Sequence, residues 1–390
     1  MTAFAAALAC HAALLAAIAF EGVAQNLVLI TDATDPPAVR ALNTRTLAMG
    51  TMVEYTLADL AALGIDPARS DGENRTLRPS GIALLEGTYS DTIFWADAGA
   101  GAILGLRFDS SGMRVLARGL SMPEALLLDR STELYAATGK QALYWGDSIS
   151  NRIQRCLIDY SVGGAGNCTD GVSDVITSGV GHVAGLAHNP VTSRLYWADG
   201  EQMKVFSVMI DRATGAAQVA QTLEELVAYV AMPVALALEF ASGASLGAER
   251  LYLLDQARPA QLSRVWLNGN DTQTLVRYGL SRPRAVGLAA DEHFFAIADS
   301  GTKQVLVGRS NADSPGLREA YQADNFEPRG LVIRSDAEIF LALSTAAVGS
   351  QELDSAAPRR GGAAGSQPAS WISTCLALVS AASLAASFMR

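Results

Sequence analysis

Six aspartates recur along the chain, each at the end of a short apolar segment, 44 to 65 residues from the next. They are Asp32, Asp97, Asp147, Asp199, Asp255 and Asp299. Carboxylates in a ring could hold a metal ion or perform acid–base chemistry. A carboxylate that follows the same apolar segment in every repeat more simply accepts backbone hydrogen bonds, once per repeat. We therefore expect these six residues to be structural, without a metal.

A second set of residues could bind a ligand. Each lies one position after the start of another short apolar segment, which a proline usually opens; the six are Ser80, Glu124, Ala184, Val234, Arg284 and Arg329. One acid, two arginines and two apolar residues make a poor oxygen cage for a cation. Arg284 and Arg329 could instead grip a carboxylate or an acidic loop together. The alternative is that both arginines are solvated or pair with nearby acids. The candidate ligand-binding residues are thus Glu124, Arg284 and Arg329.

Histidine chemistry receives little support from the sequence. His182 and His188 flank one apolar segment and could approach a channel, and His293 lies beside another strand. No serine or cysteine nucleophile motif accompanies them. The chain also contains no glycine-rich phosphate loop and no Cys/His metal spacing. We expect neither a catalytic residue nor a cofactor.

The elements that position these residues form a repeat. A short segment that is apolar on both faces precedes every aspartate segment except the first, which ends at Asp32, and a polar, alternating stretch follows each of them. The spacing fits the four-stranded blades of an all-β propeller. Six blades result if residues 330–333 pair with the segment ending at Asp32 and close the ring. Residues 339–343 could add a seventh. Short helical inserts are expected between blades at 56–64 and 222–232, where capping-box patterns occur.

Aromatic pairs mark the aspartate segments of the middle repeats, at Trp95, Tyr144, Trp145, Tyr196 and Trp197. Large rings at such positions are expected to pack between blades. These segments, over about residues 27 to 335, resemble the YWTD (class B) repeats of the low-density lipoprotein receptor family. The resemblance implies a six-bladed propeller at the cell surface that binds a protein. The mature chain has too few cysteines for the Cys-rich modules of those receptors.

The two ends of the chain predict export and anchoring. Residues 1–24 have the pattern of a secretory signal peptide. A propeller over 25–344 is followed by a flexible linker, 345–370, with small residues suited to GPI attachment, and by an apolar tail, 371–390. A single-pass membrane span is the alternative for the tail. We expect the protein on the extracellular face of the cell membrane.

Two further features agree with export. Cys156 and Cys168 remain after both ends are removed and are expected to form a disulfide. Three N-x-Thr sequons, at Asn74, Asn167 and Asn270, are candidate glycosylation sites.

Composition narrows the function. The 390 residues are 50% hydrophobic and 17% charged with a net charge of −10, which excludes a disordered chain and disfavours nucleic-acid binding. The sequence thus predicts a binding or adhesion module for an extracellular protein or glycan, attached to the membrane by its anchor and not an enzyme. One alternative is a metal-dependent lactonase or esterase in the propeller channel, and another is a wall or matrix protein.

Overall fold

The structure is a computed structural model that describes most of the predicted propeller. The described residues are 27–66, 68, 75–86, 91–108, 112–129, 132–159, 168, 170–217, 223–239, 249–267, 271–289, 294–309 and 316–334. The chain divides into two units, Met1–Ala347 and Val348–Arg390, and all described residues belong to the first. Several predictions lie outside the described residues: the signal peptide, the linker, the tail, the segment 339–343, His293 and all three sequon asparagines.

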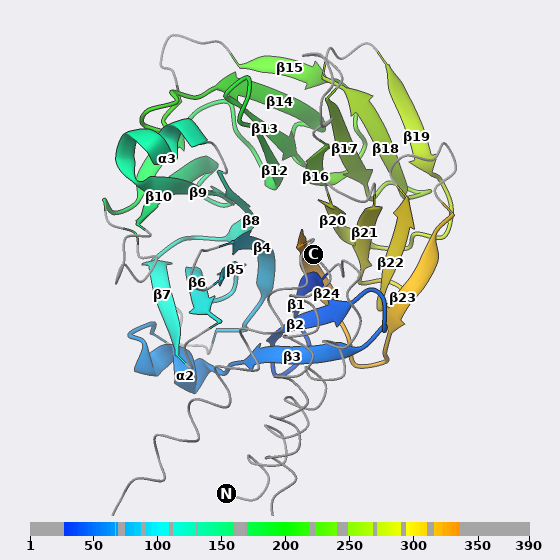
Figure 1. Ribbon diagram of the computed structural model, residues 1–390, viewed down its shortest axis with the longest axis horizontal. Coiled ribbons are helices and arrows are strands. Elements are labelled where there is room, and N and C mark those ends of the chain that lie inside the picture. The colour runs from blue at the N-terminus through cyan, green and yellow to red at the C-terminus, as the bar shows by residue number, and fades with distance from the viewer. Residues whose placement is uncertain are drawn as a thin grey trace, which may run out of the picture. The chain divides into compact units, whose positions relative to one another are not determined.

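Six antiparallel sheets of four strands each form a ring, as Figure 1 shows. The predicted six-bladed, all-β propeller is confirmed. Blade 2 contains β4 (Pro79–Leu85), β5 (Thr92–Asp97), β6 (Ala102–Arg107) and β7 (Met113–Arg118). Blade 3 contains β8 (Pro123–Leu128), β9 (Lys140–Asp147), β10 (Arg152–Asp159) and β11 (Ser173–Ile176). Blade 4 contains β12 (Val183–Asn189), β13 (Arg194–Asp199), β14 (Lys204–Met209) and β15 (Glu224–Val227).

Blades 5 and 6 are built in the same way from consecutive strands. Blade 5 contains β16 (Pro233–Glu239), β17 (Arg250–Asp255), β18 (Gln261–Trp266) and β19 (Thr272–Val276). Blade 6 contains β20 (Pro283–Ala289), β21 (Phe294–Asp299), β22 (Gln304–Arg309) and β23 (Arg318–Gln322). In blades 2 to 6 the first strand in chain order lies innermost, around the centre of the ring (Figure 1).

Blade 1 joins the two ends of the described chain. The strand β24 (Pro328–Arg334) pairs with β1 (Leu27–Asp32), and β2 (Ala38–Asn43) and β3 (Met49–Glu54) complete the sheet. The register aligns Leu27 with Arg334 and Asp32 with Pro328. The predicted closure by residues 330–333 is therefore confirmed. Closing the ring in this way gives every blade a neighbouring blade on both of its faces.

The hydrophobic core is divided into six clusters, each between two neighbouring blades. The cluster between blades 3 and 4, for example, contains Tyr144, Ile153 and Trp197. Trp95 lies between blades 1 and 2, and Trp145 between blades 2 and 3. These three tryptophans have no exposed surface. Each cluster depends on both of the blades that form it, because an isolated four-stranded blade would expose two apolar faces.

One predicted helix is confirmed and the other is wrong. Helix α2 (Leu57–Ala62) begins with a capping box between Thr56 and Asp59 and is followed by Gly64 at a φ of +81°. In contrast, the segment predicted as a helix at 222–232 contains the strand β15 instead. Its capping-box acid, Glu225, pairs across the sheet with Phe206 and forms an ion pair with Lys204 at 2.5 Å. Pairing with β14 thus overrides the local helical pattern.

A helix that the sequence analysis missed, α3 (Thr132–Thr138), lies inside blade 3 between β8 and β9. It precedes Gly139, whose φ of +68° is typical of a residue that ends a helix. No helix among the described residues combines the length and the apolar character that a membrane crossing requires.

A disulfide joins Cys156 on β10 to Cys168, twelve residues further along the chain. Its S–S distance is 2.06 Å, and Cys168 also forms an isolated β-bridge with Ile158. The bond therefore ties the connection that leaves β10 back to that strand.

Candidate binding site at the mouth of the central channel

The six repeated aspartates hold the start of each inner strand. In the sheet register each aspartate lies directly opposite the first residue of the inner strand. Its carboxylate accepts a hydrogen bond from a backbone N–H one or two residues before that strand. The donor residues for the six carboxylates are Arg78, Met122, Gly181, Met232, Arg282 and Glu327, at 2.7 to 2.9 Å. The aspartates thus attach each inter-blade connection to its own blade.

Proline suits the paired position, because it has no N–H to contribute to the ladder. Five of the six inner strands begin with proline, and β12 begins with Val183. Each aspartate ends the second strand of its blade, counted from the channel, and all six are at most 5% exposed. Burial of Asp97 raises its pKa, although hydrogen bonds from Arg78, Ala100 and Tyr55 oppose the shift.

A shift in register follows each paired aspartate. In blade 6 Pro283 lies opposite Asp299 and Ala285 opposite Ala298, so Arg284 is the extra residue. The same irregularity occurs at the start of the other inner strands. A β-bulge changes the direction of the side chain at the extra position. The bulge therefore gives each blade one side chain at the mouth of the channel.

These six side chains line one cavity of about 160 Å³. They are the six that the sequence places one position after each strand start: Ser80, Glu124, Ala184, Val234, Arg284 and Arg329. The cavity thus brings the three candidate ligand-binding residues to one place. His182 lines the same cavity and was not among the candidate binding residues. The feature of the sequence that could have indicated this was the position of His182 just before an inner strand.

Glu124 and His182 form an ion pair that bridges blades 3 and 4 at this mouth. The Ser148 hydroxyl donates a second hydrogen bond to Glu124, at 3.0 Å. Burial acts to raise the pKa of Glu124, but His182 and Ser148 outweigh it and hold that pKa below its usual range. The hydrogen bond to Glu124 raises the pKa of His182. Glu124 is therefore an engaged carboxylate.

The two arginines differ in their partners. Arg329 forms an ion pair with Glu327, whereas the Arg284 Nε donates to the Ser300 hydroxyl at 3.3 Å. Burial, followed by the charges of Arg329 and Arg282, lowers the pKa of Arg284 to about 10. Of these two arginines, Arg329 forms the predicted pair with a nearby acid, and Arg284 hydrogen-bonds to a serine. At Arg284 the neighbouring charges are mixed, because Glu327 and Glu124 oppose the effect of Arg329 and Arg282.

More exposed side chains lie on the connections that enter the inner strands. The connection to β20 carries Arg277, Tyr278 and Arg282, and Tyr278 is 77% exposed. Tyr229, on the connection to β16, is 94% exposed at a φ of 62°. Tyrosine and arginine are enriched in protein interfaces. Nothing in the sequence repeat distinguished these loop residues.

The donor set at the mouth does not fit a metal ion. Within the described ranges no group of three or more His, Cys, Asp or Glu side chains could hold one. At the mouth itself, Glu124 is engaged by His182 and Ser148, and two arginines line the same cavity. A cation would meet repulsion there, whereas an anion would meet attraction.

The fold defines a protein of the six-bladed β-propeller class with an arginine-containing channel mouth. No family model matches the chain. A curated relative, protein cueball from Drosophila grimshawi, is 24% identical over 159 residues, which are 40% of this chain and 25% of cueball. The chain therefore spans about a quarter of the length of this relative.

Among solved structures, a chain of the nidogen/laminin complex is similar with a TM-score of 0.56 and 15% identity, covering 79% of this chain and 98% of that one. TolB from Acinetobacter baumannii has a TM-score of 0.49 at 10% identity, covering 80% of this chain and 66% of that one. The similarity to the chain of the nidogen/laminin complex shows the propeller fold.

Proposed function

We propose that this chain is a binding module on the extracellular side of the cell membrane, of the YWTD type, and that it recognises a protein ligand at the channel mouth. The observation that supports the proposal is the convergence of Arg284 and Arg329 in one cavity. The six repeats supply identical scaffolding, so the side chains that break the repeat are the ones available for recognition.

The chemistry of the mouth selects an acidic group. A guanidinium binds a carboxylate through paired N–H donors, and its charge stays largely independent of pH. Burial, and after it the charges of Arg329 and Arg282, lower the pKa of Arg284, so an incoming carboxylate would offset this repulsion as well as form hydrogen bonds. The proposed ligand therefore presents an aspartate or glutamate on a loop that enters the mouth, while its surrounding surface rests on Tyr278 and Arg282.

The alternative, a metal-dependent lactonase or esterase, would use the same mouth. It would need several free oxygen donors pointing at one cation. The residues present are Ser80, Glu124 and His182 beside two arginines, and Glu124 and His182 already bind each other. This donor set gives the binding module the stronger support.

The experiment displays the chain on cells and measures the binding of a panel of purified extracellular domains. For a domain that binds saturably, Arg284→Gln together with Arg329→Gln is expected to weaken binding at least tenfold. Arg309→Gln is the matched control, because Arg309 is an exposed arginine at the far end of β22. Equal binding by the double variant and the control would contradict the proposal.

A further inference from the structure

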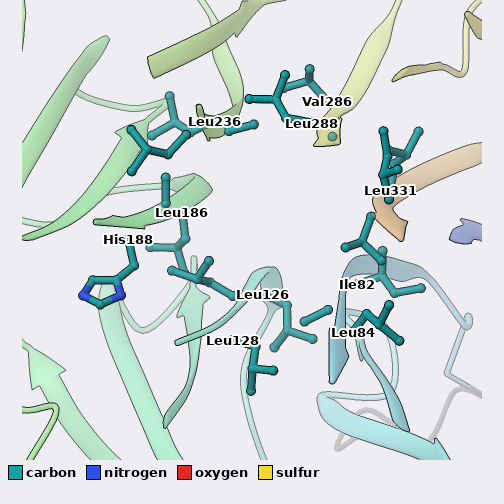
Figure 2. Close-up of a pocket in the computed structure, with 18 of the residues that line it drawn as sticks. Ile82, Leu84, Leu126, Leu128, Leu186, His188, Leu236, Val286, Leu288 and Leu331 are labelled. Atoms are coloured by element: carbon teal, nitrogen blue, oxygen red, sulfur yellow. The ribbon is translucent and has the colours of Figure 1, made fainter. Parts of the chain in front are cut away.

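A second cavity continues from the mouth along the central channel. Its volume is about 480 Å³, within the range of about 300–1,000 Å³ that is common for small-molecule sites. Figure 2 shows leucine, isoleucine and valine side chains from the six inner strands arranged around it. The side chains that line the cavity are therefore mainly aliphatic, although polar atoms also contribute to its surface.

The mouth and this channel form one passage, because one residue from each inner strand lines both cavities. These residues are Ile82, Leu126, Leu186, Leu236, Val286 and Leu331. A molecule that entered at Arg284 and Arg329 would therefore reach the aliphatic lining directly behind them.

The ends of the passage differ in charge. At the far end the channel is lined by Glu86, His188 and Glu239. Glu239 accepts from the Tyr252 hydroxyl at 3.3 Å and lies 3.8 Å from Arg250. His188 lies 3.0 Å from Asp129 and is nearly fully buried. The side chains at this end thus have partners within the protein, whereas the mouth presents two arginines, Arg284 and Arg329, to the same cavity.

We propose that the channel binds an aliphatic carboxylate, with its head group at Arg284 and Arg329 and its chain along the six aliphatic residues behind them. The proposal rests on the proposed function only in using the same arginines as an anion anchor. The inner strands have no further strand on their channel side. The backbone N–H and C=O groups on that side need water as a hydrogen-bond partner, and a single alkyl chain is thin enough to leave room for it.

The test is titration calorimetry of the purified chain, in detergent-free buffer, with hexanoate, octanoate, decanoate and dodecanoate. Affinity is expected to rise about three- to fourfold per added methylene, as burial of a CH₂ group predicts. Decanol, which has a similar chain without the charge, is expected to bind at least tenfold more weakly than decanoate. Failure of decanoate to bind saturably would overturn the proposal.

Variants separate the head-group contact from the chain contact. Arg284→Gln with Arg329→Gln is expected to lower the decanoate affinity at least tenfold and to keep the dependence on chain length. Leu238→Phe and Leu288→Phe, made singly, fill the channel from half-buried lining positions. Each is expected to flatten the dependence on chain length. Leu226→Phe, on the outer strand β15, is the control and should change neither.

Folding of each variant is checked by its thermal midpoint without ligand, and either folded channel variant suffices. An unchanged dependence on chain length in a folded channel variant would overturn the proposal. If decanoate binding depends on the arginines but no protein of the panel binds, the proposed function is contradicted and the channel proposal is not. A protein ligand lost in the arginine variants, without decanoate binding, would sink the channel proposal alone.

Discussion

Two positions that lie close together in space in every blade have opposite roles in this propeller. The paired aspartate is the same residue in all six blades, is buried, and fixes the backbone before the inner strand. The residue after the strand start differs from blade to blade and lines the channel mouth. The comparison shows how a repeat protein separates stability from recognition: the repeated side chain satisfies a backbone need, and the variable one meets the ligand.

The largest expected effect is at the aspartate of blade 6. Asp299→Ala removes the acceptor for the backbone N–H groups of Ser281, Arg282, Gly301 and Thr302. Because four backbone donors lose one fully buried carboxylate as their partner, the free energy of unfolding should fall by about 3 kcal/mol. Urea unfolding followed by tryptophan fluorescence measures this loss. Asp299→Asn keeps one acceptor and should lose less; a loss below about 1 kcal/mol for the alanine variant would break the comparison.

An intermediate effect of opposite sign is expected at the mouth of the same blade. Burial and the nearby Arg329 and Arg282 lower the pKa of Arg284 to about 10, so its charge opposes folding at neutral pH. Arg284→Gln should therefore leave the free energy of unfolding unchanged or raise it by up to about 1 kcal/mol, since the side chain is partly solvated. The same urea titration tests it. A clear loss of stability would mean that this mouth residue also has a scaffolding role.

The smallest effect is expected at the Glu124–His182 pair, which is partly exposed. Glu124→Gln should cost less than about 1 kcal/mol of unfolding free energy near pH 5.5. The pKa of Glu124 is lowered, so its contribution is lost as the pH falls through that lowered value. The pKa of His182 is raised, so its contribution is lost as the pH rises through that raised value.

The difference between wild type and Glu124→Gln should therefore be greatest between the ordinary pKa values of about 4.3 for Glu and 6.5 for His. It should shrink at pH 3 and at pH 9. Unfolding at these three values measures it, and His182→Gln should show the same window. A difference that persists undiminished at pH 9 would exclude the ion pair as its source.

Much of the scaffold could be predicted from local pattern. The aspartates, the prolines opposite most of them and the short apolar strands recur in order, so the blades and their closure followed from spacing. The segment at 224–227 could not be predicted in this way. Its capping pattern was local, whereas its pairing with β14 depends on residues about twenty positions away.

The candidate site was predictable only in part. Arg284 and Arg329 could be assigned to equivalent positions because each follows the proline that begins an inner strand. The contacts of the residues at the mouth could not be predicted from the repeat. Glu124 meets His182 across a blade boundary and 58 residues of sequence. Tyr229 and Tyr278 lie on connections whose exposure no periodicity encodes.

The sequence by itself determined the repeat, and with it which residue of each blade binds the backbone and which is free to vary. Periodicity suffices for this, because each blade solves the same local hydrogen-bonding and packing problem. The tertiary structure alone decided that six variable side chains meet in one cavity, that Arg284 lies among charges of both signs, and that an aliphatic passage continues behind it. These properties arise from closing the ring, which brings residues from all six repeats to a common axis.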